Sequence, residues 1–281
     1  MTKKDHPGVG KTIDAGGIAT NYIEDGQGEA LVFLHGSAPG VCAWSTWSDL
    51  MPEFSDQYWT LAPDIVSFGF TAYNPSVNYT MKHWAGHLIS FLDAKGIKKA
   101  TLVGSSFGGS VALAAAISNP DRVSRIVALA TPCGKFNVTA GLKAGRSYKP
   151  GLENMRKLLE VYPVDKSVIT DALVEERFLA ATIQGDRPSL HALVPQRAIE
   201  TDEPVEISGM PEGLVAKLDI PVLVMHGRED PAVPCELGLR LAKSVKNSEM
   251  VFIGNCGHMV QLERRELFID TTRSFLRRTV G

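Results

Sequence analysis

Gly104-Ser105-Ser106-Phe107-Gly108 is the stretch that decides the fold, because it has the spacing G-x-S-x-G. A short apolar run (residues 100–103) precedes it, and a helical pattern (residues 109–118) follows it. A strand that turns sharply into a helix exposes the hydroxyl of the serine at the apex. Ser106 is therefore the candidate nucleophile. The alternative is a Gly-rich turn in which the serine is incidental.

Short apolar runs alternate with helical patterns on both sides of this motif. Continuous apolarity over a few residues is typical of strands covered on both faces, and it occurs at residues 31–34, 59–62, 101–103, 126–130, 222–225 and 250–253. Two further strands, at 11–15 and 18–23, flank the turn-forming pair Gly16-Gly17. We predict an α/β protein whose sheet has eight mostly parallel strands.

The alternation of strands and helices stops after Thr131-Pro132. No buried strand is evident from about residue 133 to residue 210, and helical patterns stand out at 152–161 and at about 167–184. Strand character returns at residues 219–224. We expect a core made of residues 1–132 and 211–281, with residues 133–210 inserted as a helical cap.

The composition is that of an ordinary globular protein, with 281 residues and 44% hydrophobic residues. The formal net charge of −2 and the short basic doublets give no sign of a nucleic-acid or membrane partner. No apolar stretch has the length of a transmembrane helix, and no signal peptide is evident. None of the four cysteines forms C-x-x-C, so we expect free thiols and a cytoplasmic location.

A serine nucleophile needs a base, and the base needs an acid that orients it. Asp230 follows the strand at 222–225, and His258 follows the strand at 250–253. Both loops leave the carboxyl edge of a parallel sheet, where Ser106 is also expected. The chain order Ser106, Asp230, His258 is that of α/β-hydrolases. Glu229 is the rival acid.

An oxyanion formed during the attack must also be stabilised. In this type of elbow one donor is the amide of the residue after the nucleophile, which here is Phe107. The second donor comes from the loop after the third strand, and we assign it to the Ser37 amide. The alternative for Ser37 is a simple turn residue. We interpret His35 as a residue that braces this loop.

The chain resembles the meta-cleavage product hydrolases of the α/β-hydrolase superfamily over nearly its whole length. The family has a run similar to residues 34–44, Leu-His-Gly-Ser-Ala-Pro-Gly-Val-Cys-Ala-Trp. Further matches are Ala62-Pro63-Asp64 with Ser67-Phe68-Gly69-Phe70, the elbow, His226-Gly227-Arg228-Glu229-Asp230 and Cys256-Gly257-His258. The loop that contains Pro39-Gly40 is more specific than the elbow, which many lipases and esterases share.

The resemblance implies residues that bind a carboxylate-bearing substrate. Arg177 has only apolar neighbours one helical turn away, and the family uses an arginine followed by an aromatic residue, here Phe178, to bind the substrate carboxylate. A snorkelling arginine, or one paired across the domains, is the alternative. The chain departs from the family where Ser105 and Thr46 replace asparagines and Met259 replaces a tryptophan. We expect these three residues and Val233 to line the substrate site.

The resemblance implies hydrolysis of a carbon–carbon bond in a 2-hydroxy-6-oxo-dienoate produced by aromatic ring fission. A carboxylesterase or lactonase with the same triad is the alternative, and a non-catalytic binding protein is a second class. Whether Ser106 forms an acyl-enzyme or assists water stays open. We expect no cofactor and no metal, and the family is often dimeric. The i, i+4 pair His83 and His87 is interpreted as part of a solvated helix face.

Overall fold

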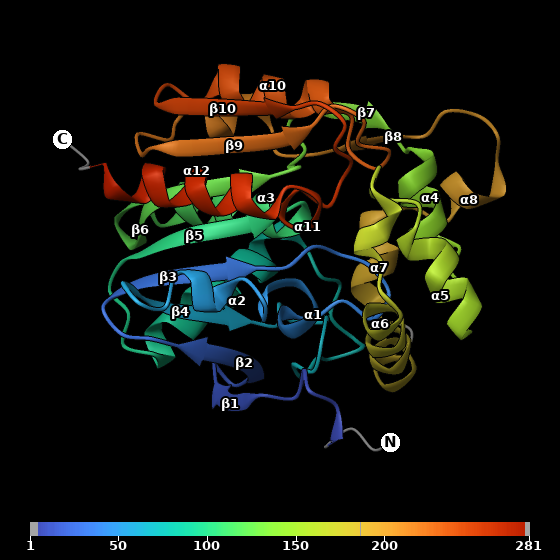
Figure 1. The fold of residues 1–281 in the computed structure, drawn as a ribbon, viewed down its shortest axis with the longest axis horizontal. Helices are drawn as coiled ribbons and strands as arrows, with labels where there is room; N and C mark the ends of the chain where they lie inside the picture. The colour runs from blue at the N-terminus through green and yellow to red at the C-terminus, as the bar shows by residue number, and fades with distance from the viewer. Residues whose placement is uncertain (1–4, 186, 279–281) are drawn as a thin grey trace.

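The structure, a computed structural model, describes residues 5–185 and 187–278. Its main sheet has eight strands in the order β1-β2-β4-β3-β5-β6-β9-β10, and all neighbours from β4 to β10 pair in parallel (Figure 1). The prediction of an eight-stranded, mostly parallel sheet is confirmed. The strands are β1 Lys11–Asp14, β2 Ala19–Asp25, β3 Glu29–Leu34, β4 Tyr58–Pro63, β5 Ala100–Ser105, β6 Val123–Leu129, β9 Val222–Gly227 and β10 Ser248–Ile253.

Helices cover both faces of the sheet because consecutive strand residues alternate between two apolar clusters. In β3, Val32 and Leu34 belong to one cluster, which also holds side chains of α2 (Met81–Ala94), α3 (Phe107–Ser118) and α10 (Cys235–Ser244). Leu31 and Phe33 belong to the other, with side chains of α1 (Ala43–Trp47), α11 (Val260–Glu263) and α12 (Arg265–Arg277). The sheet is thus the middle of three layers, and the loops that leave its carboxyl edge start from a rigid support.

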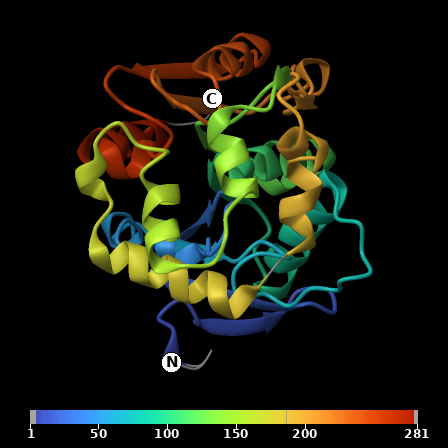
Figure 2. The same cartoon turned by 90° about the vertical axis from the view of Figure 1, so that its right-hand side faces the viewer.

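Residues 133–210, which we call the cap, lie across that carboxyl edge (Figure 2). The cap contains α4 Ala140–Arg146, α5 Leu152–Leu159, α6 Asp171–Gln184, α7 Pro188–Leu193 and α8 Arg197–Glu200. A parallel bridge between Cys133 and Met210 joins its two ends, and the short helix α9, Glu212–Val215, follows.

The cap also holds a two-stranded antiparallel sheet that the sequence analysis did not predict. It consists of β7, Lys135–Asn137, and β8, Glu206–Ser208. Each strand has only three residues and is partly or fully exposed, so neither carries the apolar run that marks the main strands. The pairing places Phe136 opposite Ile207 beside the cap helices.

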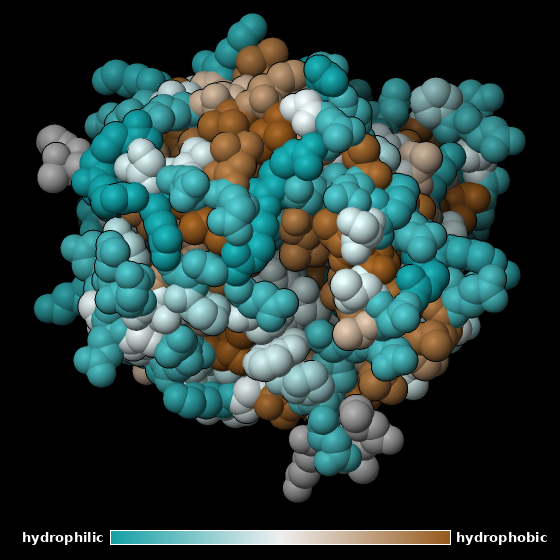
Figure 3. Space-filling view, viewed as in Figure 1, coloured by the Kyte–Doolittle hydropathy of each residue, from teal (hydrophilic) through white to brown (hydrophobic). Residues whose placement is uncertain are grey.

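Two sequence-based expectations were wrong. We expected β10 to be covered on both faces, but it is the edge strand, and Phe252 on it is 51% exposed. Figure 3 shows apolar surface over this edge of the molecule. We also expected His87 on a solvated helix face. It is buried, and its Nε2 lies 2.8 Å from Thr20 Oγ1, because α2 packs against the N-terminal hairpin.

Candidate active site

The backbone places Ser106 at a sharp turn between β5 and α3. Its φ of 54° and ψ of −114° lie outside the ordinary regions for a residue with a side chain. Its amide donates to Leu129 O at 2.7 Å, which anchors the turn to β6. The flanking glycines are required by close approach, because a Cβ on Gly108 would lie 2.3 Å from Leu34 O. The turn therefore holds Ser106 at the carboxyl edge.

Asp230 and His258 meet beside this turn. His258 Nδ1 lies 2.7 Å from Asp230 Oδ2, and the Asp230 side chain is fully buried. Asp230 Oδ1 accepts from the amides of Ala232 and Val233 at 2.8 and 2.9 Å, so the carboxylate is fixed from both sides. Ser106 and His258 line the same cavity, although no hydrogen bond joins their side chains in the described part of the chain. In many enzymes the hydrogen bond between the nucleophile and its base becomes short only when substrate binds.

The pairing shifts the pKa of both groups. Burial opposes ionisation of Asp230, but His258 and His226 outweigh it and hold the pKa of Asp230 well below its usual range. Burial likewise disfavours the charged form of His258, but the Asp230 carboxylate outweighs it and raises the pKa of His258 above 6.5. An Nδ1–H bonded to Asp230 leaves Nε2 of the neutral ring free to accept a proton.

Glu229 and Cys256, which could compete for the roles of acid and nucleophile, are engaged in other contacts or kept unreactive. The Glu229 carboxylate accepts from Cys256 N at 3.1 Å and from Arg228 Nε at 2.8 Å, and Asp230 is the carboxylate that contacts His258. Burial raises the pKa of the Cys256 thiol to about 12, which keeps it protonated at neutral pH.

The loop after β3 carries Ser37 and is braced from below. His35 Nε2 accepts from Ile65 N at 3.0 Å, so Nδ1 carries the proton and donates to Gly36 O at 2.7 Å. Burial lowers the pKa of His35 to about 4, which keeps the ring neutral. The bracing interpretation of His35 is confirmed. Within the described residues, the Ser37 and Phe107 amides donate no hydrogen bond to another protein group, so both are available to an oxyanion.

Arg177 reaches the site from the cap. It is 6% exposed, its Nη2 donates to Pro39 O at 3.0 Å, and its Nε is buried without a partner in the described residues. The contact depends on Gly40, because a Cβ there would lie 2.1 Å from Arg177 O. Burial lowers the pKa of Arg177, so an anion beside it would relieve an unfavourable desolvation.

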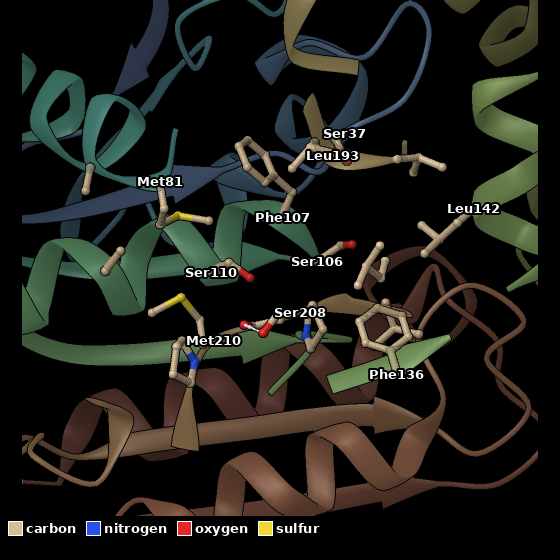
Figure 4. Close-up of a pocket in the computed structure, with 18 of the residues that line it drawn as sticks. Ser37, Met81, Ser106, Phe107, Ser110, Phe136, Leu142, Leu193, Ser208 and Met210 are labelled. Carbon is tan, nitrogen blue, oxygen red and sulfur yellow. Dashed lines mark hydrogen bonds between the residues drawn. The ribbon is translucent and has the colours of Figure 1, made fainter. Parts of the chain in front are cut away.

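Two cavities meet at Ser106. The small cavity has a volume of about 80 Å³ and holds His258 and Arg177, together with Gly36, Val41, Ser45, Thr46, Ser105, Leu173, Ala232, Met259, Gln261 and Leu262. The large cavity, about 440 Å³, runs between α2, α3 and the cap and is lined mainly by apolar side chains (Figure 4). The residues shared by both walls are Ser37, Ala38, Ser106, Leu142 and Tyr162.

The other residues that we predicted to line the substrate site lie in different places relative to the two cavities. Ser105, Thr46 and Met259 line the small cavity, and Val233 lines the large one. Phe178 lines neither cavity. Its partly buried ring packs instead against the apolar cluster of the cap, because the residue after Arg177 lies on another side of α6.

Two positioning residues were missed by the sequence analysis. Glu263 accepts from the amides on both sides of His258, at 3.0 Å from Gly257 N and 3.2 Å from Met259 N. His226 Nε2 lies 3.2 Å from Asp230 Oδ2 and 2.9 Å from Val233 O. His226 was visible in the motif that ends at Asp230, but the sequence contains no sign of the contacts that Glu263 makes.

The described residues were compared with two further kinds of site, a metal-binding cluster and a membrane-spanning helix. Residues 5–185 and 187–278 contain no group of three or more His, Cys, Asp or Glu side chains that could hold a metal ion. In the same part of the chain, every helix is too short or too polar to cross a membrane.

Comparison with known proteins adds the following findings. Residues 29–265 match the family described as alpha/beta hydrolase fold. The chain is 37% identical to the 2-hydroxy-6-oxo-2,4-heptadienoate hydrolase of Pseudomonas putida strain F1, over 95% of the chain and 96% of that protein. It is 36% identical to the 2-hydroxymuconate semialdehyde hydrolase of Pseudomonas sp. strain CF600, over 97% and 95%.

Solved structures agree with these sequence matches. A mutant of the meta-cleavage product hydrolase from Pseudomonas fluorescens IP01, complexed with acetates, superposes with a TM-score of 0.87 at 35% identity, over 96% of this chain and 98% of that one. The 2-hydroxy-6-oxo-6-phenylhexa-2,4-dienoate hydrolase from Rhodococcus sp. strain RHA1 superposes with a TM-score of 0.83 at 25% identity, over 95% and 98%.

Proposed function

Because the chain belongs to the α/β-hydrolase fold family and, within it, to the meta-cleavage product hydrolases, we propose that it hydrolyses a carbon–carbon bond in a 2-hydroxy-6-oxo-dienoate. The observation that carries this proposal is the junction of two cavities at Ser106. A buried arginine with an uncommitted donor lies in one of them, and apolar walls enclose the other. A substrate with a carboxylate at one end and a ketone near the other matches that arrangement.

The reaction would proceed in two stages. The dienol first shifts to its keto form, which moves a proton to C5 and makes the C5–C6 bond cleavable. The C6 carbonyl is then attacked, and the electron pair of the C5–C6 bond passes into the dienoate fragment. Water supplies the hydroxyl that ends on C6 in the carboxylic acid, and its proton restores the C2 hydroxyl of the dienoate fragment, replacing the proton that moved to C5.

In this proposal Ser106 is the nucleophile, His258 moves the protons and Asp230 holds His258 in the required tautomer. The amides of Ser37 and Phe107 stabilise the oxyanion, since both lie beside Ser106 and neither has a competing acceptor among the described residues.

Arg177 binds the substrate carboxylate, and Ser105, Thr46 and Met259 surround the dienoate in the small cavity. Phe178 supports α6 from within the cap rather than contacting the substrate. The division into a core of residues 1–132 and 211–281 and a cap of residues 133–210 is part of the proposal, with the substrate between them. A cytoplasmic location and a homo-oligomeric state remain predictions.

Product analysis tests the proposed reaction. The purified protein is incubated with 2-hydroxy-6-oxo-2,4-heptadienoate, which carries a methyl group on its C6 carbonyl, and the products are identified by mass spectrometry. We expect acetate and 2-hydroxypenta-2,4-dienoate in equal amounts, and none from the Ser106→Ala variant above the spontaneous rate. Unchanged dienoate in the presence of folded wild-type protein would contradict the proposal.

A further inference from the structure

Ser110 is a buried serine in the wall of the large cavity, and its hydroxyl has no partner in the described residues. It lies four residues after Ser106, on the first turn of α3, and both side chains line the large cavity. Figure 4 shows both hydroxyls directed into the cavity. Although Ser110 is only 4% exposed, a ligand in the cavity can reach its hydroxyl.

Two other serine hydroxyls in the same wall already have protein acceptors. Ser118 Oγ, two turns further along α3, donates to Ala114 O at 2.8 Å, which is the usual bond of a helical serine. Ser208 Oγ, on the opposite side, donates to Gly209 O at 3.0 Å. Ser110 makes no such bond, and the carbonyl one turn before it belongs to the strained Ser106.

The surroundings of Ser110 are apolar. Figure 4 shows Met81 and Met210 on either side of it and Phe107 on the preceding turn of the wall. A hydroxyl enclosed in this way gains more from a hydrogen bond than an exposed one, because water competes less for it. Ser110 therefore offers the cavity a free hydroxyl among apolar side chains, one helical turn from the nucleophile, whereas the Nε of Arg146, also unpartnered in the described part of the chain, lies on the cap side of the same cavity.

The size of the large cavity sets a second condition on the occupant. Its volume is about 440 Å³, whereas a one-carbon substituent occupies roughly the space of a water molecule, about 30 Å³. A substrate whose carbonyl carries hydrogen or methyl would leave most of this space unfilled. The small cavity is already assigned to the dienoate and its carboxylate, so the large one faces the other substituent of the carbonyl.

We propose that the substrate carries on its C6 carbonyl a large, mainly apolar group, alkyl or aryl, with a hydroxyl, amino or keto function that hydrogen-bonds to Ser110. Ser110 is thus a residue that determines specificity. This inference rests on the proposed function, because it takes the carbonyl at Ser106 as the point where the two halves of the substrate meet.

The test compares four 2-hydroxy-6-oxo-2,4-dienoates whose C6 substituent is methyl, phenyl, 2-hydroxyphenyl or 3-hydroxyphenyl. We expect wild-type kcat/KM to be about tenfold higher or more for phenyl than for methyl, and higher again for at least one hydroxyphenyl substrate. The Ser110→Ala variant should lose about three- to tenfold on that hydroxyphenyl substrate and change less than about twofold on phenyl.

Ser244→Ala is the matched control, because Ser244 is also helical, lies outside both cavities and donates to Arg240 O at 2.9 Å. The kcat/KM of this control should equal that of the wild type on every substrate, and melting curves should show that both variants are folded. A wild-type preference for methyl, or equal losses of Ser110→Ala on phenyl and hydroxyphenyl, would overturn the inference and leave the proposed function intact. Turnover of none of the four substrates would overturn both.

Discussion

Ser106 occupies a backbone conformation that costs on the order of 1–3 kcal/mol when a non-glycine residue adopts it. The surrounding contacts have to hold it there, and the amide bond to Leu129 O together with the flanking glycines does so. Strain of this kind is retained where it exposes a reactive group. The side chain can therefore be removed without removing the contacts that stabilise the turn.

The first prediction concerns the reacting groups. Ser106→Ala and His258→Ala should each lower kcat on the best substrate by roughly 10³- to 10⁶-fold, because each removes a member of a unit that acts together. Steady-state kinetics on the purified variants measures the loss. Retention of more than about a tenth of wild-type turnover, with an unchanged melting curve, would show that the residue was assigned the wrong role.

A second prediction follows from the raised pKa of His258. Only the neutral ring can accept the Ser106 proton, so activity is lost as the pH falls through this pKa. The acid limb of kcat/KM should therefore have its midpoint above pH 6.5, the ordinary value for histidine. A pH–rate profile between pH 5 and 9 measures it, and a profile flat down to pH 5 would rule out a histidine base.

A third prediction concerns Arg177. Arg177→Met keeps much of the apolar stem but removes a charge-assisted hydrogen bond, worth about 1.5–3 kcal/mol. We expect a loss in kcat/KM of roughly 10- to 150-fold on carboxylate-bearing dienoates and of less than about threefold on a neutral ester. Equal losses on the two would mean that Arg177 acts through its contact with Pro39 O, by supporting the loop of Ser37.

At the scale of elements, the loops after β9 and β10 bring Asp230 and His258 together because parallel strands end at the same edge. This could be predicted from sequence, since apolar runs mark the strands and the polar residues follow them directly. The contacts of Glu263 could not be predicted. They join a carboxylate to backbone amides, including Val164 N at 2.7 Å in the cap, and a backbone amide leaves no sign in a sequence.

A fourth prediction belongs to this loop. Glu263→Gln removes a charge that raises the pKa of His258, so the acid limb of kcat/KM should move to lower pH. It also leaves buried amides without their carboxylate acceptor, which should cost about 1–3 kcal/mol of unfolding free energy. The pH–rate profile and a denaturant titration measure the two effects. An unmoved acid limb would show that Glu263 does not act on His258.

Short elements and helix faces were the least predictable parts of the fold. β7 and β8 are three residues each and half exposed, so they carry neither an apolar run nor alternation. His87 was placed wrongly because a histidine is compatible with either face of a helix, and only its packing beside Thr20 decides. The main strands and long helices could be predicted from their apolar patterns. The short strands of the cap and the orientation of His87 depend on tertiary contacts.

At the scale of the whole molecule, the site exists only because the cap and the core are packed together. Arg177 on α6 contacts the loop after β3. The backbone carbonyl of Tyr162, in the cap, accepts from His258 N at 3.0 Å. The sequence indicated an inserted helical segment but not the two cavities of unequal size, which depend on how that segment lies on the core. Substrate selection is thus a property of the assembled molecule.

The two cavities that meet at Ser106, with buried Arg177 in one of them, suit a dienoate rather than a simple ester. The most direct test is the ratio of kcat/KM for a 2-hydroxy-6-oxo-dienoate to that for a nitrophenyl ester with the same acyl group, measured side by side on the wild-type protein. Because only the dienoate offers a carboxylate to Arg177, we predict a ratio of about ten or more. An ester hydrolysed as well as the dienoate, or better, would identify the protein as a carboxylesterase instead.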